Sequence, residues 1–337
     1  MKPDPFFILG CPRSGTTLLQ LLIDSYTKIA IPPESHIFSR YATLLDTYGK
    51  LSDLNNLRIF VRDLLSDYRI RDWSLNIGVD EFIQELETAS KENVIELLFE
   101  LYARRHGKQR WGDKTPQHML YLSLITNFFP NAKFIHLIRD GRDVAVSSSR
   151  TFVGPASIYG IARVWRKYIF AFHEFKRNLA MDQYLEVYYE NLVRNPQNEC
   201  NRIFHFLKER PVTISGDLPD TETKQHYIKR DLHMHSLEGR ITDKKIGTYR
   251  RRFSKRQIEI FETVAGDALK LHNYSLLTDG KAIISFKEKV SFFIRDYVYR
   301  YYRKYFRPSN PNEVVNLFKE ESQIWFRRLC RGHLGNV

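Results

Sequence analysis

The sequence lacks a disulfide framework and a long apolar segment. Its three cysteines, Cys11, Cys200 and Cys330, are odd in number and widely scattered. This excludes a small disulfide-stapled scaffold and suits a reducing compartment, so we expect a cytoplasmic protein. No apolar run reaches the roughly 18–20 residues that a membrane-spanning helix needs. The apolar run that begins at Phe6 is also too short for a signal peptide.

Negative charge is scarce as well. The chain has 52 Lys and Arg against 39 Asp and Glu, which gives a net charge of +13 over 337 residues. Such an excess favours an anionic partner, whether a nucleotide, a nucleic acid or a membrane surface. Residues 281–337 hold twelve basic and five acidic residues. More than half of the excess positive charge therefore lies in the last sixth of the chain.

Short apolar runs alternate with amphipathic segments along most of the chain. The runs at 6–10 and 133–138 are typical of buried strands, and 183–192 is typical of a strand followed by a turn. This alternation predicts an α/β, P-loop-like, three-layer fold with a central, mainly parallel sheet and helices on both faces. Helices are expected at 16–26, 116–129, 160–178, 196–208 and 254–274.

Two segments are expected to add to this core. Helical periodicity over about 41–107 indicates a helical insertion. We therefore predict an α/β domain over 1–276 that includes the insertion, and a basic, aromatic, helical extension over 277–337.

The first apolar run leads into a loop whose composition suits an anion. A Gly- and Ser-rich turn before a helix directs backbone N–H groups and the positive end of the helix dipole at one ligand. Thr16 stands where a Walker loop requires lysine, and Arg13 supplies positive charge instead. An ordinary strand-to-helix turn is the alternative. The candidate anion ligands are Pro12, Arg13, Ser14, Gly15, Thr16 and Thr17.

A second candidate anion site follows the strand at 133–138. Arg139 stands at the carboxyl end of this strand, where ligands of open α/β sheets gather. Ser147 lies two turns along the next helix, so the two side chains could hold a separate phosphate. A solvated turn with internal ion pairs is the alternative for this Arg-Asp-Gly-Arg-Asp stretch.

Together, PRSGTT and RDGRD followed by Ser147 resemble the sulfotransferase superfamily, whose members use 3′-phosphoadenosine 5′-phosphosulfate (PAPS). The resemblance covers roughly residues 5–275 and is closest to the tyrosylprotein sulfotransferase and bacterial branch. It implies that the first loop holds the 5′-phosphosulfate, while Arg139 and Ser147 hold the 3′-phosphate. It also implies adenosine 3′,5′-bisphosphate (PAP) as product and no metal.

The resemblance implies roles for three further residues. Glu34, in PPES, matches the catalytic base, and a carboxylate near the loop could take the acceptor proton. Lys114, in GDKTP, matches a lysine at the transferring sulfuryl and bridging oxygen, where, with Arg13, it would stabilise the charge that builds on the leaving phosphate. Tyr189, in VYYENL, matches a tyrosine near the adenine. A structural or solvated role is the alternative for each.

Two assignments remain open within the resemblance. His36 is a second base candidate, although a structural role fits it better. In the family a late segment closes over the 3′-phosphate, and residues 239–252 are the equivalent here. Lys244, Lys245 and Arg250 are its candidate ligands.

The sequence therefore predicts a PAPS-dependent sulfotransferase that moves a sulfuryl group to an acceptor hydroxyl by in-line displacement. The acceptor is left open among carbohydrate, lipid, small alcohol and tyrosine. One alternative is a P-loop kinase or NTPase, which the missing Walker lysine disfavours. The other is a non-catalytic membrane-associated protein on the same fold.

The C-terminal extension has three interpretations. Apolar and aromatic residues recur at helical spacing from Phe286 to Tyr305, with Lys and Arg on other faces and Pro308 expected to end the helix. We favour a helix that packs on the catalytic domain and helps to cover the substrate cleft. Peripheral contact with an anionic membrane is the second interpretation. Nucleic acid is disfavoured because no recognised binding motif accompanies the charge.

Overall fold

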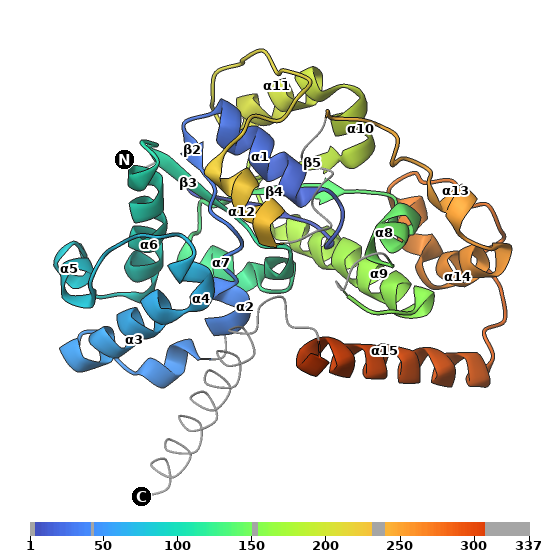
Figure 1. Cartoon of the computed structure of the whole chain (residues 1–337), viewed down its shortest axis with the longest axis horizontal. Coiled ribbons are helices and arrows are strands. Elements are labelled where there is room, and N and C mark those ends of the chain that lie inside the picture. The colour runs from blue at the N-terminus through green and yellow to red at the C-terminus, as the bar shows by residue number, and fades with distance from the viewer. Residues whose placement is uncertain (1–3, 42–43, 150–153, 231–239, 307–337) are drawn as a thin grey trace, which may run out of the picture.

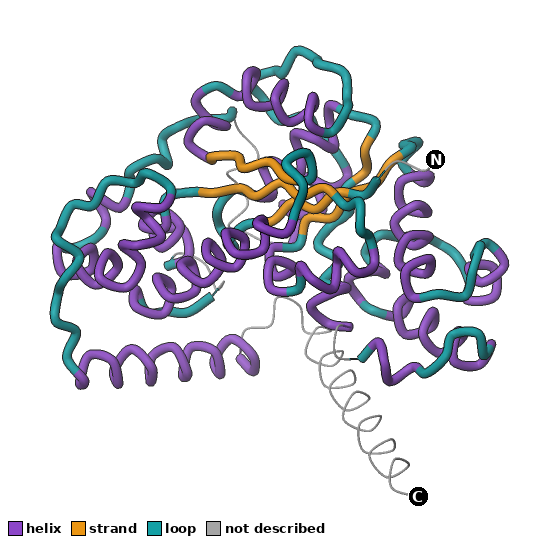
Figure 2. Tube along the Cα trace, turned by 180° about the vertical axis from the view of Figure 1, so that it is seen from behind, coloured by secondary structure: helices purple, strands orange, loops and turns teal. Residues whose placement is uncertain are grey.

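The computed structural model describes residues 4–41, 44–149, 154–230 and 240–306. A sheet of five parallel strands crosses the centre of this part of the chain, in the order β2-β3-β1-β4-β5, and helices cover both of its faces (Figures 1 and 2). The predicted parallel, three-layer α/β architecture is confirmed. The strands are β1 (Phe6–Leu9), β2 (Ile29–Ala30), β3 (Arg110–Lys114), β4 (Lys133–Ile138) and β5 (Tyr184–Tyr188).

Fifteen α-helices are described around this sheet. They are α1 (Thr16–Tyr26), α2 (Ile37–Tyr41), α3 (Leu54–Ser66), α4 (Tyr68–Arg71), α5 (Val79–Gln84), α6 (Lys91–Arg105), α7 (Leu122–Phe128), α8 (Gly141–Ser148), α9 (Ile158–Phe175), α10 (Tyr189–Arg194), α11 (Pro196–Phe206), α12 (Glu222–Arg230), α13 (Tyr249–Arg252), α14 (Lys255–Leu271) and α15 (Phe286–Phe306). Short 3-10 helices lie at Leu45–Tyr48, Pro116–Leu120 and Lys176–Asn178.

The middle strand β1 shows why the apolar run FFIL forms this core. Side chains of a strand alternate between the two faces of a sheet, and all four residues of β1 are fully buried. Phe7 and Leu9 pack in the core that includes residues of α3, α6, α9 and α14, whereas Phe6 and Ile8 pack in the core of α1 and α11. A continuous apolar run is the pattern of a parallel strand that is covered on both faces.

The segment predicted as a helical insertion contains α3 to α6, and it shares the main core. Phe60 and Leu64 of α3 and Phe99 of α6 lie in the same apolar cluster as Phe7 of β1. The Phe99 ring stacks on Trp111 of β3, with ring centroids 4.5 Å apart. These helices therefore extend one face of the sheet.

The continuous helix expected from Pro116 to 129 is wrong. A 3-10 helix at Pro116–Leu120 and the separate α7 replace it, with a break at Tyr121. The Thr115 side chain does not cap the first of them; its hydroxyl instead accepts from the His36 backbone N–H (3.3 Å) and donates to the Asp113 carboxylate (3.2 Å). The predicted strand and turn at 183–192 is a strand that ends at Tyr188 and passes into α10.

The helix α15 lies along one edge of the molecule and packs on α9 (Figure 1). The 277–282 segment before it is tied to α14, because the Glu262 carboxylate accepts hydrogen bonds from the backbone N–H groups of Leu277 and Thr278. The predicted stop at Pro308 lies outside the described residues. Among the described helices, none is both long and apolar enough to cross a membrane.

Candidate active site

The carboxyl ends of the five parallel strands bring the predicted site residues to one edge of the sheet. The loop at 10–15 follows β1, Lys114 is the last residue of β3, Arg139 follows β4 and Tyr189 follows β5. Glu34 comes shortly after β2. This is the edge at which open α/β sheets bind their ligands.

The loop after β1 offers hydrogen-bond donors that have no partner in the described part of the chain. Gly15 precedes α1 and no side chain caps that helix, so the first N–H groups of α1 are available to an anion. The Ser14 hydroxyl is buried and has no hydrogen-bond partner among the described residues. Gly15 has φ +100°, and a Cβ there would lie 2.6 Å from the Tyr189 ring. Arg13 is also left-handed, at φ +73°, a conformation that is uncommon for residues other than glycine and occurs often at ligand-binding sites.

Lys114 supplies a positive charge beside this loop, where Thr16 replaces the lysine of a Walker loop. Its side chain is fully buried, and its Nζ lies 3.3 Å from the Thr17 hydroxyl at the start of α1. The same Nζ lies 2.5 Å from Glu34 Oε1. The ammonium also sits over the ring of Tyr227 from α12, 4.7 Å from its centroid. A lysine from another strand thus stands beside the loop in space.

Glu34 is held as a carboxylate. Burial favours its neutral form, but the Lys114 charge and the contact with His36 outweigh this and hold the pKa of Glu34 well below its usual range. His36 Nε2 lies 3.2 Å from Glu34 Oε2. Burial lowers the pKa of His36, so its imidazole is neutral at neutral pH. A proton on Nε2 lets this ring donate to the carboxylate and orient it.

A buried polar network that the sequence did not reveal holds the Glu34 segment in place. The Asp113 carboxylate accepts from the Ser35 hydroxyl (3.1 Å) and lies 2.7 Å from His118 Nδ1. His118 Nε2 in turn accepts from the Phe38 backbone N–H (3.2 Å). The residues on both sides of Lys114 therefore position the segment that carries Glu34.

Arg139 lies against the loop, as the strand-end position predicts. Its guanidinium is buried and donates to the Arg13 carbonyl (3.1 Å) and to the Lys245 carbonyl (2.9 Å), while its Nε has no partner among the described residues. Ser147 Oγ accepts from Arg13 Nε at 3.3 Å. The two candidate anion sites are thus adjacent, and the late segment reaches them through Lys245.

The rest of the RDGRD motif is structural. The alternative of a solvated turn with internal ion pairs is wrong about solvation, because the motif is buried, but an ion pair within the motif is present. Arg142 pairs with Asp140 (2.7 Å) and with Glu262 of α14 (2.6 Å). Asp143 accepts from the backbone N–H groups of Gly247 (2.6 Å) and Tyr249 (3.0 Å). These bonds fix α8 and anchor the late segment over Arg139.

Tyr189 and Tyr227 are the aromatic residues of the site. Tyr189, predicted near the adenine, is buried between Gly15 and the Arg139 guanidinium, which lies 4.3 Å from its ring centroid. Tyr227 donates to Gln20 (2.9 Å), whose amide bonds the carbonyls that precede Glu34. No local signal marks Tyr227, because α12 is remote in sequence and was not predicted.

All eleven predicted site residues lie in or beside this one region. Among the described residues, no group of three or more His, Cys, Asp and Glu side chains could hold a metal ion. The eleven predicted site residues are Pro12, Arg13, Ser14, Gly15, Thr16, Thr17, Glu34, Lys114, Arg139, Ser147 and Tyr189.

This arrangement of loop, strand ends and cations defines an anion-binding α/β protein of the P-loop-like type. A model of the sulfotransferase family matches residues 5–212, more than half of the chain, and the chain belongs to this family. The recognised superfamily is therefore confirmed.

Several known proteins are similar to the chain. A protein-tyrosine sulfotransferase from Drosophila melanogaster is 28% identical over 208 residues, which are 60% of this chain and 37% of that protein. Protein-tyrosine sulfotransferase A from Caenorhabditis elegans is 24% identical over 248 residues, 70% of this chain and 57% of that protein. The chain thus spans between about a third and three fifths of the length of these two relatives.

Parts of this chain are also similar to solved structures of sulfotransferases. The sulfotransferase domain from the Synechococcus PCC 7002 olefin synthase has a TM-score of 0.49 and 22% identity, and the match covers 78% of this chain and 95% of that one.

Proposed function

We propose that this chain transfers a sulfuryl group from PAPS to an acceptor hydroxyl. PAPS would supply an activated sulfuryl group and leave as adenosine 3′,5′-bisphosphate. The observation that carries the proposal is the placement of Lys114 Nζ between the Glu34 carboxylate (2.5 Å) and the Thr17 hydroxyl of the anion-binding loop (3.3 Å). A base, a cation and an anion site meet at this point.

The unsatisfied hydrogen-bond donors of the site fit an anionic sulfuryl-donor molecule that carries two phosphate groups. The Ser14 hydroxyl and Arg139 Nε are buried without partners among the described residues, and the N-terminus of α1 has no side-chain cap. Buried donors of this kind are rare unless a ligand satisfies them. The loop from Pro12 to Thr17 would hold the 5′-phosphosulfate, and Arg139 and Ser147 would hold the 3′-phosphate.

Glu34 would take the proton of the acceptor hydroxyl. Its carboxylate is ionised at neutral pH because of Lys114, although so low a pKa makes a weak base. Lys114 also contacts the loop, so an anion held there would draw the ammonium away from Glu34. The pKa of Glu34 would then rise toward that of an effective base, while Lys114 and Arg13 stabilise charge at the loop.

The site indicates that the acceptor carries a hydroxyl group, but it does not indicate which compound this is. The relatives are named protein-tyrosine sulfotransferases, so a tyrosine peptide is the first acceptor to test, together with carbohydrates, lipids and small alcohols. A cytoplasmic location stays a prediction.

Calorimetric binding of adenosine 3′,5′-bisphosphate, AMP and ATP to the wild type and to Arg139→Ala tests the donor. We expect the bisphosphate to bind more tightly than AMP by about 10- to 100-fold, which is the size of one or two hydrogen bonds to a charged group. Arg139→Ala should remove most of this preference. Arg163→Ala, at an exposed position on α9, is the matched control and should leave it unchanged.

Because Arg139 also donates to the Arg13 carbonyl, Ser147→Ala provides a second variant. It removes only the hydroxyl that accepts from Arg13 Nε. Ser147→Ala should weaken the binding of the bisphosphate more than the binding of AMP. If ATP bound as well as the bisphosphate to the wild type, the assignment of a 3′-phosphate site would be wrong, and phosphoryl transfer would be the better hypothesis.

A further inference from the structure

One stripe of α15 attaches this helix to the rest of the molecule. Glu288, Phe292, Asp296 and Tyr299, which recur every three or four residues, are half-buried, whereas the other described side chains from 286 to 302 are exposed. Phe292 stacks on Tyr159 of α9, with ring centroids 5.7 Å apart. This spacing is that of a single helix face, so the helix presents its other faces to solvent.

Both acidic residues of α15 are used for this attachment. The Asp296 carboxylate accepts from the backbone N–H of Ala156 (2.9 Å) and from the backbone N–H and hydroxyl of Ser157 (2.6 Å each). Glu288 pairs with Arg256 of α14 at 2.8 Å and accepts from Ser285 at the start of the helix. The attachment therefore fixes the rotation of the helix and leaves no carboxylate on its outer face.

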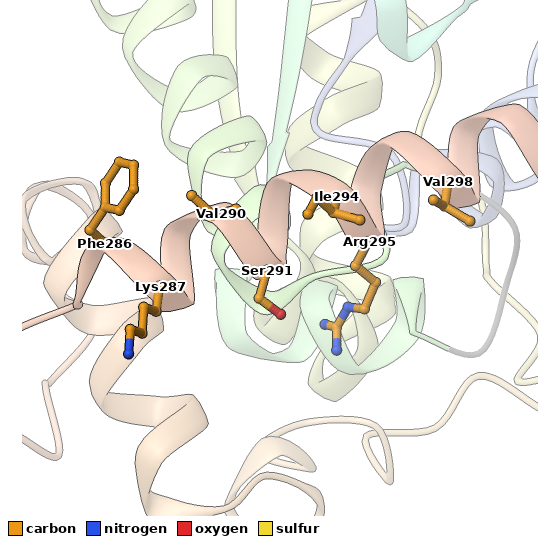
Figure 3. A pocket seen from close by; sticks show the side chains of 7 residues that line it. All are labelled: Phe286, Lys287, Val290, Ser291, Ile294, Arg295 and Val298. Carbon is orange, nitrogen blue, oxygen red and sulfur yellow. The ribbon is translucent and has the colours of Figure 1, made fainter.

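Apolar side chains follow the outer face of α15 from Phe286 to Val298. Phe286, Phe293 and Tyr297 are exposed to 81%, 71% and 61%, and they are adjacent on a helical wheel. Val290, Ile294 and Val298 continue the same face. With Phe286, Lys287, Ser291 and Arg295 they line a shallow, open pocket on the helix surface (Figure 3). Soluble monomers rarely expose such a continuous apolar surface unless it binds something. We call these six residues the outer face.

Basic residues border this outer face on both sides. On a helical wheel of 3.6 residues per turn, Lys289 and Arg300 border one margin of this face, and Lys287 lies near the other margin, between Ile294 and Val298. All three side chains are exposed. The helix thus has an apolar centre with a rim of positive charge alone. This is the pattern of helices that lie in the interface of a membrane with anionic lipids.

We propose that the outer face of α15 binds the surface of an anionic phospholipid bilayer, with the helix lying in the plane of the membrane. The apolar side chains would enter the boundary between headgroups and acyl chains, and the basic rim would contact lipid phosphates. Charge complementarity favours this occupant over a second copy of the chain. Two outer faces brought together would oppose two rims of the same charge, whereas an anionic surface neutralises both rims.

The attachment of α15 makes such binding possible for the folded molecule. The helix has 21 residues, which corresponds to a length of about 32 Å. Asp296 and Phe292 already hold its outer face away from α9. Binding would therefore need no release or refolding of the helix, and it is independent of the proposed sulfuryl transfer.

Flotation of the full chain with lipid vesicles tests the proposal. One set contains 30 mol% phosphatidylglycerol in phosphatidylcholine, and the other contains phosphatidylcholine alone. We expect at least tenfold tighter binding to the anionic set, reduced by added salt. The triple variant Phe286→Ser, Phe293→Ser, Tyr297→Ser should lose at least tenfold. The charge variant Lys289→Glu, Arg300→Glu should also lose at least tenfold, since each basic side chain near such a surface contributes about fivefold.

Matched controls separate this effect from general changes in surface properties. Met181→Ser removes another highly exposed apolar side chain, and Lys255→Glu reverses another exposed charge on α14. Neither should alter vesicle binding. The melting temperature of every variant should match that of the wild type, because the altered side chains lie outside the attachment stripe.

Two results would overturn the proposal. The first is equal binding to both vesicle sets, or binding that neither α15 variant weakens. The second is a concentration-dependent dimer in sedimentation equilibrium that the triple variant abolishes while vesicles bind no protein. That outcome would assign the outer face to a second copy of the chain.

Discussion

At the scale of single residues, the site depends on one ammonium group that contacts both the candidate base and the anion-binding loop. Lys114 Nζ is fully buried and contacts both the Glu34 carboxylate and the Thr17 hydroxyl. A buried lysine stays charged only beside a partner of opposite charge, and Glu34 provides it when the loop holds no anion. The pair therefore keeps the cation in place and the carboxylate ionised.

Replacing Glu34 by Ala should abolish turnover but leave binding of the bisphosphate nearly intact. General-base catalysis contributes about 10²- to 10⁴-fold, and Glu34 follows β2 and lies outside the anion-binding loop. The measurement is turnover with PAPS and an accepting hydroxyl compound, together with calorimetry of the bisphosphate. Glu81→Ala, on α5, is a control that should change neither value. Retention of most of the activity by Glu34→Ala would show that another group is the base.

At the scale of elements, α8 is fixed by a buried ion network rather than by apolar contacts alone. Arg142 is almost fully buried and joins Asp140, at the start of α8, to Glu262 of α14. The network sets the position of α8, which carries Ser147, and of the strand end that carries Arg139. A helix far from the loop in sequence therefore stabilises the candidate 3′-phosphate site.

Arg142→Met should lower the free energy of unfolding by about 3–5 kcal/mol, because it leaves two buried carboxylates without their cation. Urea denaturation at neutral pH measures this change. Arg166→Met is the matched control, since it breaks an exposed pair with Asp267 on the same α14 helix. Exposed pairs contribute about 0–1 kcal/mol. Equal losses in the two variants would mean that the buried network has no special structural role.

At the scale of the whole molecule, polar groups buried beneath the sheet edge should make the fold sensitive to acid. His272 of the α14 C-terminus is buried near His136, Glu186, Lys176 and His173. Burial, assisted by the charge that His136 would carry, lowers the pKa of His272 to about 4. Burial lowers the pKa of His136 as well.

The sign of the effect follows from these lowered pKa values. The folded state prefers neutral imidazoles, so stability is complete above the ordinary histidine pKa of about 6.5 and falls as the pH drops from there toward 4. His272 alone accounts for a loss of up to about 3 kcal/mol. Urea denaturation at pH 7, 5.5 and 4.5 should show a decline that His272→Gln reduces. Parallel pH curves for the two proteins would contradict the prediction.

Local patterns in the sequence determined much of the fold and most of the candidate site. The strands at 6–9 and 133–138, the helix at 16–26 and the parallel architecture agree with the predictions, because apolar periodicity reports directly which residues are covered. The loop and RDGRD motifs were found for a similar reason. The loop places several candidate anion ligands within a few consecutive residues at a strand end. RDGRD places one, Arg139, at another strand end, and its other charged residues are structural.

Long-range contacts decided what local patterns could not. The pairing of Lys114 with Glu34, the contact of Tyr227 with Lys114, and the structural role of Arg142 all join residues from different elements. Such partners are determined by the order of the parallel strands within the sheet and by the helices that cover the strand ends. The local sequence therefore determined which groups are present at each strand end. Only the tertiary structure decided which of them meet, and which face of α15 is left open to solvent.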